Sequence, residues 1–209
     1  MTPSTTPRRP LRPDGARVWV ALCVLLGLAS VAVAFTGAQA SLVWRAASWM
    51  HHPWVLWTAS LVHLSLAHLL VNLAALAVLA VLGAFVQAGR AATLALLLAW
   101  PLGTLALSCW PQVGGYSGMS GLLMSMAGVL WAHTTLRPAT KPLSFLLFTV
   151  LALKLLSEHA WSQPIAFDPE WGFNVVYAAH LAGALAGAAC GLLFEAIGRV
   201  LRPASNGTQ

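Results

Sequence analysis

Two short segments carry side chains that could form a nucleophile and its base. Residues 114–121 (GGYSGMSG) are a glycine-rich turn that leads into an apolar helix and carries Ser120. Residues 179–183 (AHLAG) place His180 inside another apolar helix, which continues with glycines at helical spacing. A serine hydroxyl needs an adjacent base to become a good nucleophile, and neutral histidine is the usual one. We therefore expect Ser120 to be the nucleophile and His180 to accept its proton.

The composition indicates a membrane protein. Hydrophobic residues make up 59% of the chain and charged residues 8%, whereas about a quarter of a soluble domain is charged. The net charge of +6 comes from basic residues beside apolar runs, which is typical of a topology signal and not of nucleic-acid binding. The three cysteines lie in apolar runs without disulfide or metal-site spacing, and we expect them to pack in the interior.

Six apolar runs predict an all-α membrane protein with six transmembrane helices in one bundle. They cover residues 17–36, 65–85, 91–110, 119–134, 142–157 and 174–198. A tryptophan-rich connector at 37–64 is expected at the bilayer–water boundary. The domain prediction is a disordered cytoplasmic tail at 1–16, a six-helix membrane domain at 17–198 and a cytoplasmic tail at 199–209. The first run is interpreted as a retained span, with a cleaved signal sequence as the alternative.

The basic residues give the orientation. In a six-span topology one face holds the N-terminal tail together with Arg90, Arg137, Lys141, Arg199 and Arg202. The other face holds a single basic residue and two acidic ones: Arg45, Asp168 and Glu170. Because cytoplasmic loops are enriched in lysine and arginine, we expect both termini in the cytoplasm.

Four polar side chains fall at one depth in this topology. His68, Asn72, Ser120 and His180 all lie in the outer third of the bilayer, where polar groups are costly and usually functional. Close packing of the fourth and sixth spans would join Ser120 to His180. Both spans carry small residues at the spacing that allows such packing, namely Gly121, Ser125 and Gly128 in one and Gly183, Gly187 and Gly191 in the other.

An oxyanion site can be formed from the same residues. Ser120 at a helix start brings free backbone N–H groups and the positive end of the helix dipole. His68 and Asn72 are four residues apart, so they share a helix face and can both donate. No Asp or Glu is expected where it could orient His180, so the sequence predicts a dyad without cofactor or metal.

Three segments together resemble the signature segments of rhomboid intramembrane serine proteases. They are residues 63–72 (HLSLAHLLVN), residues 118–121 (GMSG), and residues 179–183 with Gly187. The resemblance extends over about 54–191 in the order that the family has. It implies Ser120 as nucleophile, His180 as base, an oxyanion site from His68, Asn72 and the Ser120 backbone, and a loop shaped by Gly118 and Met119.

The chain departs from the family pattern at two places. The usual Trp-Arg of the first loop is half kept, as Trp54-Val55, and Met124 stands where an aromatic often lies beneath the catalytic histidine. Within the family, Tyr116 and residues 154–158 (KLLSE) look like the rhombosortase branch, which often has histidine at the Met124 position. That branch is proposed to process proteins that end in a Gly-Gly motif, a span and a basic tail.

We accordingly expect an integral protein of the bacterial inner (cell) membrane with its active site opening to the outer face. Its partners would be membrane-anchored protein substrates and the lipid bilayer, and not nucleic acid; the oligomeric state stays open. Alternatives are a general rhomboid protease with other single-span substrates, a non-catalytic rhomboid-like protein that binds transmembrane clients, and a small proton-coupled transporter.

Other polar residues have simpler interpretations. Ser117 is the alternative nucleophile, and His68 and Asn72 could instead bond between helices. Lys154 and Glu158 are four residues apart and are expected to form an ion pair. The remaining histidines of connectors and span ends are expected at the membrane interface: His51, His52, His133 and His159.

Overall fold

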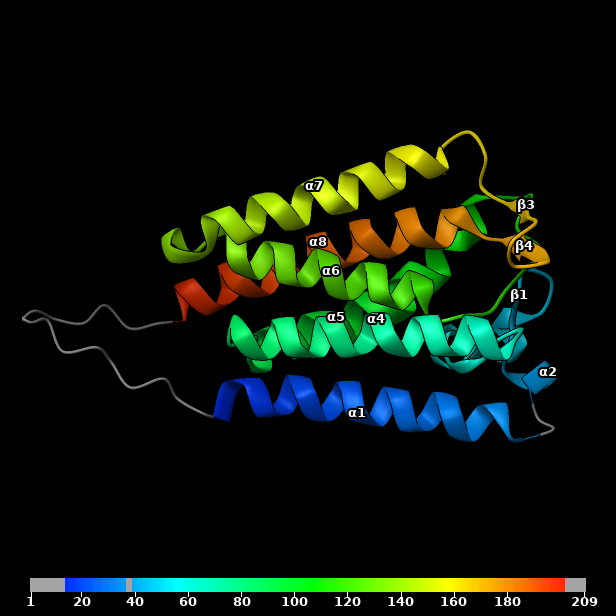
Figure 1. Ribbon diagram of the computed structural model, residues 1–209, viewed down its shortest axis with the longest axis horizontal. Helices are drawn as coiled ribbons and strands as arrows, with labels where there is room; N and C mark the ends of the chain where they lie inside the picture. Colours follow the sequence, from blue (N-terminus) through cyan, green and yellow to red (C-terminus); the bar gives the residue numbers. More distant parts are fainter. Residues whose placement is uncertain (1–13, 37–38, 202–209) are drawn as a thin grey trace, which may run out of the picture.

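The computed structural model describes residues 14–36 and 39–201. The expected tails therefore lie largely outside the described residues, at 1–13 and 202–209. Helices dominate the described chain, as the apolar runs predict (Figure 1). The six longest are α1 (Asp14–Ala34), α4 (Leu66–Phe85), α5 (Arg90–Leu105), α6 (Ser120–Thr135), α7 (Lys141–Glu158) and α8 (Tyr177–Val200). Each corresponds to one expected run, and α1 begins three residues earlier than expected.

Shorter elements connect these helices. The connector contains α2 (Gln39–Leu42), α3 (Val55–Thr58) and two 3-10 turns, η1 (Trp49–His51) and η2 (Ala59–Leu61). Two further turns, η3 (Ala106–Cys109) and η4 (Pro138–Thr140), follow α5 and precede α7. Strand β1 (Trp44–Arg45) pairs antiparallel with β2 (Gly115–Tyr116), and β3 (Ala166–Asp168) with β4 (Phe173–Val175). All four strands lie at the end of the bundle opposite to the start of α1 and the end of α8 (Figure 1).

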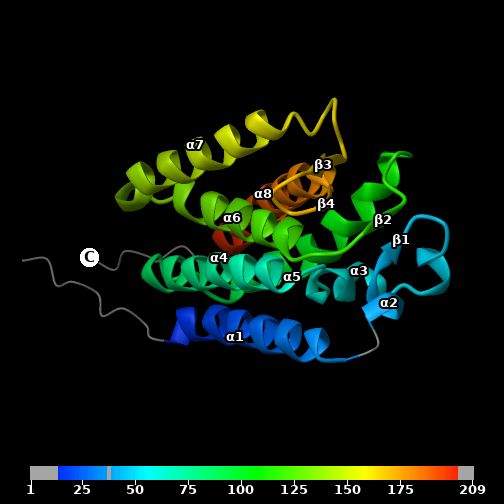
Figure 2. The ribbon, with the colours of Figure 1, turned by 45° about the vertical axis from the view of Figure 1, so that its right-hand side comes forward.

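Length and composition identify five candidate membrane spans among the described residues. They are Ala16–Ala34, Leu66–Phe85, Arg90–Cys109, Pro138–Glu158 and Tyr177–Val200. The expected span that is missing from these five is the fourth, which corresponds to α6; this helix has 16 residues and is shorter than the roughly 20 residues that cross a bilayer. Eleven of its residues are buried. Helix α6 is thus the central helix, with α1 and α7 on opposite sides of the bundle (Figures 1 and 2).

Close contact between α6 and α8 depends on glycine. A Cβ atom on Gly183 would overlap the carbonyl oxygen of Gly121, and one on Gly187 would overlap that of Ser125. On α6, a Cβ atom on Gly128 would come within 2.6 Å of the Ala184 carbonyl oxygen. These two helices therefore touch backbone to backbone, as the spacing of small residues predicts.

Helix α1 is fixed to the bundle by a tryptophan. The Trp19 side chain is fully buried, and its indole N–H donates to the Leu79 carbonyl of α4 at 3.1 Å. The ring lies where a side chain on Gly83 would otherwise be. The glycine thus allows an aromatic ring to pack against the α4 backbone and to satisfy its polar atom there.

The expectation for His133 is wrong. This side chain is buried, with Nδ1 2.7 Å from Glu195 Oε1 of α8 and Nε2 3.1 Å from the Val86 carbonyl oxygen. Arg137 joins the cluster, since its guanidinium lies 3.1 Å from the same Glu195 oxygen. A buried histidine needs partners for both ring nitrogens, and the carboxylate on the neighbouring helix supplies one that the position of His133 in the sequence does not reveal.

The glycine contact gives a stability prediction. Replacing Gly187 by alanine should lower the free energy of unfolding by about 1–3 kcal/mol, because the added methyl group forces α8 away from the α6 backbone. Thermal unfolding in detergent measures this loss. Gly198→Ala on the same helix is the matched control, since nothing lies within 4 Å of its Cβ position. Equal losses in the two variants would contradict backbone contact at Gly187.

Candidate active site

The loop before α6 has a backbone that only glycine adopts easily. Gly118 has φ of 117°, a region that side chains strongly disfavour. A Cβ atom there would also approach the Cε1 atom of His68 to 2.8 Å. The N–H of Gly118 donates to the Ala59 carbonyl at 3.0 Å, so this hydrogen bond ties the loop to the connector. Two residues after Gly118, Ser120 is the first residue of α6.

Tyr116 braces this loop. Its hydroxyl donates to the Gly118 carbonyl at 2.5 Å and accepts from the Gly121 N–H at 3.2 Å. The side chain is only 4% exposed. Burial raises the pKa of the Tyr116 phenol, so the hydroxyl stays protonated and keeps its donor role. One side chain therefore bridges the two residues that flank Met119 and Ser120.

On α8, His180 is held by an acidic residue. Its Nδ1 lies 2.7 Å from Oε2 of Glu158, the last residue of α7. Both side chains are buried. The other ring nitrogen, Nε2, has no hydrogen-bond partner among the described residues. The sequence prediction that no Asp or Glu could orient His180 is therefore wrong.

Glu158 could have been found from the topology. The fifth apolar run starts on the cytoplasmic face in the predicted orientation, so its far end lies in the same outer layer as His180. The run was expected to end at residue 157, so the prediction placed Glu158 just outside the membrane-spanning segment. The expected ion pair of Glu158 with Lys154 is confirmed at 2.8 Å between Oε1 and Nζ.

Helix α4 positions His68 and Asn72. Ser65 caps the helix by accepting a hydrogen bond from the His68 N–H at 3.1 Å. The Asn72 side chain donates to the His68 carbonyl at 2.8 Å. The His68 ring makes an edge contact with His63, with 5.1 Å between centroids. Burial lowers the pKa of the His63 imidazole, which favours its neutral form at pH 7.

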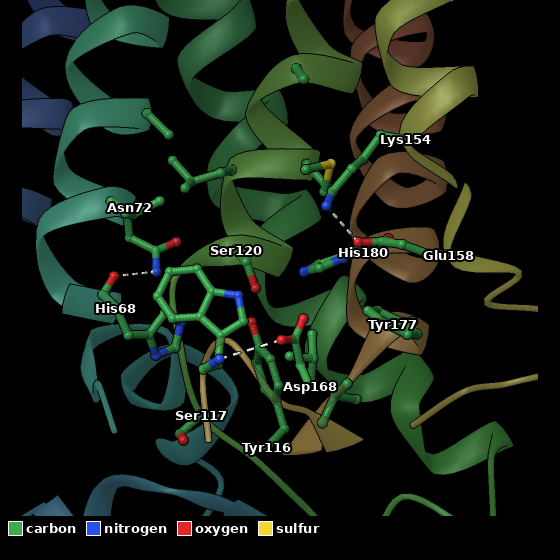
Figure 3. Close-up of a pocket in the computed structure, with 18 of the residues that line it drawn as sticks. His68, Asn72, Tyr116, Ser117, Ser120, Lys154, Glu158, Asp168, Tyr177 and His180 are labelled. Carbon is green, nitrogen blue, oxygen red and sulfur yellow. Dashed lines mark hydrogen bonds and ion pairs between the residues drawn. The ribbon is translucent and has the colours of Figure 1, made fainter. Parts of the chain in front are cut away.

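One cavity of about 1060 Å³ brings the four polar side chains together (Figure 3). Ser120, His180, His68 and Asn72 all line it, and so does the alternative nucleophile Ser117. The two expected loop residues lie behind this lining: Gly118 is buried against His68, and Met119 is fully buried in the apolar core. Polar side chains from three helices, α4, α6 and α8, therefore line one cavity.

The nucleophile and the base are not hydrogen-bonded to each other. Within the part of the chain that the structure describes, His180 Nε2 has no hydrogen-bond partner, and Ser120 is therefore not one. In Figure 3 the two side chains nevertheless face the same part of the cavity, whereas Ser117 points away from His180. Such bonds are often long without substrate and shorten in the productive complex.

Residues at the two departures from the family pattern also have clear positions. Met124 lines the cavity. At this position, where the family often has an aromatic ring, the chain has a flexible thioether side chain. In the first loop Val55 is buried, whereas Trp54 is exposed. Within the described ranges, no group of three or more His, Cys, Asp or Glu residues is placed to hold a metal ion.

Tyr116→Phe tests the brace on the loop. The variant leaves the Gly118 carbonyl and the Gly121 N–H buried without their partner, which should cost about 1–3 kcal/mol of unfolding free energy. Thermal unfolding in detergent measures this cost. Tyr177→Phe is the matched control, because the Tyr177 ring is half-buried at the cavity edge. An unchanged stability of Tyr116→Phe would show that the hydroxyl does not support the loop.

Comparison with known proteins identifies the family of the chain. No curated protein matches the chain. Residues 50–196, which cover more than half of the sequence, match the rhomboid domain. The matched region contains the loop before α6, all four polar side chains of the cavity, and Glu158. The chain belongs to the rhomboid family of membrane proteins.

Proposed function

We propose that the protein is an intramembrane serine endopeptidase that uses Ser120 as nucleophile and His180 as base. Members of the rhomboid family are generally intramembrane serine proteases, although some are inactive. The observation that carries the proposal is that Ser120, His180, His68 and Asn72 line one cavity. Ser120 at the start of α6 and a His180 Nε2 without a partner among the described residues favour an active enzyme over an inactive relative.

The reaction follows from these positions. Ser120 Oγ attacks the carbonyl carbon of the scissile peptide bond, and His180 Nε2 takes the hydroxyl proton. The developing oxyanion accepts hydrogen bonds from His68, Asn72 and the Ser120 backbone N–H, which is free because it opens the helix. His180 then returns the proton to the departing amine. Water, activated by the same histidine, hydrolyses the acyl-enzyme to release a carboxylate and restore Ser120.

The apolar part of the cavity suits a membrane-anchored substrate. Beyond the polar end, the lining consists of aliphatic side chains from three helices: Val71, Ala75 and Val78 of α4, Ala127 of α6, and Leu147 and Val150 of α7. Val78 and Val150 are more than half exposed. A groove with apolar walls fits a transmembrane segment of a substrate that has unwound locally. The apolar side chains of that segment would contact α4 and α7 in place of lipid.

The finer assignments belong to the same proposal. We interpret α6 as the fourth of six spans, shortened because its first residue, Ser120, lies at the cavity. We interpret the strand-bearing end of the bundle as the outer face of a bacterial inner membrane. Tyr116 and the Lys154–Glu158 pair, both features of the rhombosortase resemblance, lie at the cavity. This placement supports rhombosortase-like processing of substrates that end in Gly-Gly, a span and a basic tail.

A cleavage assay in liposomes tests the dyad. The substrate is a single-span protein that ends in Gly-Gly, an apolar helix and a basic tail. Ser120→Ala and His180→Ala should each lower cleavage by about 10⁴-fold or more, while Ser117→Ala should cleave like the wild type. Unaltered cleavage by Ser120→Ala would refute the proposed mechanism.

The same assay distinguishes the substrate classes. A second substrate keeps the span and the basic tail but replaces Gly-Gly by Leu-Leu. A rhombosortase-like enzyme should cleave it at least about tenfold more slowly, because leucine side chains would have to fit beside the nucleophile. Equal cleavage of the two substrates would instead indicate a general rhomboid protease.

A further inference from the structure

We propose that Glu158 is a positioning residue for His180, so that the site works as a Ser120–His180–Glu158 triad. This inference rests on the proposed function and extends it. The observation behind it is the 2.7 Å contact between Glu158 Oε2 and His180 Nδ1. It joins the end of α7 to the first turns of α8, 22 residues further along the chain.

The contact selects the useful tautomer of His180. With Nδ1 as the donor to the carboxylate, the neutral ring keeps its lone pair on Nε2. Nε2 is the nitrogen that has no partner among the described residues. It is therefore available to take the Ser120 proton. The carboxylate also stabilises the positive charge that the ring gains when it accepts that proton.

Glu158 is itself held in place from two sides. Its side chain is buried, and a buried carboxylate is costly unless both oxygens have partners. Oε2 contacts His180, and Oε1 lies 2.8 Å from Lys154 Nζ one turn earlier on α7. The Lys154 side chain itself is 49% exposed. Lys154 therefore compensates the charge of Glu158 without competing for His180.

The local backbone places this carboxylate at the site. Helix α7 ends at Glu158 because the next residue, His159, adopts the left-handed conformation with φ of 50°. The chain then turns back, and the Ala178 N–H at the start of α8 donates to the Pro164 carbonyl at 2.9 Å. The turn brings the last residue of α7 beside His180, although α7 is otherwise a peripheral helix with few buried residues.

A second histidine–carboxylate pair, away from the site, provides a control for substitutions of Glu158. Glu195 and His133 form this pair with the same 2.7 Å separation, and in it His133 is buried and Glu195 is partly buried. His133 lies 13 residues after Ser120 on α6, which corresponds to about 20 Å along the helix. Glu195→Gln therefore makes the same chemical change in a histidine–carboxylate pair outside the site. Any loss of stability that follows from breaking such a pair should appear in both variants.

Cleavage kinetics give the first test. Glu158→Gln should lower kcat by about 10²- to 10⁴-fold while KM stays near the wild-type value, because the residue acts on the base and not on substrate binding. Glu158→Asp should recover part of the loss, since it restores the negative charge at a longer distance. Glu195→Gln should keep the wild-type kcat in the folded protein. Wild-type kcat in Glu158→Gln would overturn the proposal, and so would an equal loss in Glu195→Gln.

A spectroscopic test does not depend on activity. In protein labelled with ¹⁵N at histidine, each buried imidazole N–H that donates to a carboxylate should give a strongly deshielded proton resonance. The His180 resonance should disappear in Glu158→Gln and His180→Ala but remain in Ser120→Ala and Glu195→Gln. Persistence of that resonance in Glu158→Gln would overturn the proposal.

The two tests separate the positioning role from the proposed function. If Ser120→Ala still cleaves, the protease mechanism fails, whereas the resonance still decides whether Glu158 orients His180. If Ser120→Ala is inactive and Glu158→Gln is fully active, the mechanism stands and the positioning role fails. Thermal unfolding of each variant shows that the compared proteins are folded.

Discussion

The structure depends on the backbone contact between α6 and α8. Ser120 opens one of these helices and His180 lies in the first turns of the other, so their separation is set by how closely the helix axes approach. Gly183 and Gly187 permit that approach because any side chain there would overlap a carbonyl oxygen of α6. Small residues at helix–helix contacts are typical of membrane proteins, where packing replaces the hydrophobic effect as the driving force. Here the same contact also positions the chemistry.

Buried charge is compensated in the same manner at both ends of the bundle. At the site, Glu158 of α7 pairs with His180 of α8. At the opposite end, Glu195 of α8 pairs with His133 of α6. Each carboxylate also pairs with a cationic side chain, Lys154 or Arg137. In hydrocarbon an unpaired ionisable side chain is expensive, so these pairs fix helix rotation: a turned helix would leave both members without partners.

Much of the fold could be predicted because it follows from local sequence patterns. Apolar runs gave the six longest helices, and the depth argument selected Ser120, His180, His68 and Asn72, which line one cavity. The small residues correctly predicted the α6–α8 contact. Resemblance to the rhomboid signature pointed to the same residues, and the match at 50–196 confirms the family.

What the sequence did not reveal are the polar contacts that particular side chains make. The Glu158–His180 pair depends on the left-handed turn at His159 and on the rotation of α7, which a periodicity argument cannot supply. His133 was misplaced for the same reason, because its carboxylate partner comes from another helix 62 residues away. The sequence also did not predict the hydrogen bonds of Tyr116, because a tyrosine within a glycine-rich turn does not indicate which backbone groups its hydroxyl will contact.

Labelling with a fluorophosphonate probe tests most directly whether Ser120 is an activated nucleophile. The probe phosphonylates a serine only where a base removes its proton, and peptide mass spectrometry of the labelled protein identifies the residue. We predict a single adduct, on Ser120, that forms in the wild type and is lost in His180→Ala. An adduct on Ser117, or labelling of Ser120 that is unchanged in His180→Ala, would contradict the assignment of nucleophile and base.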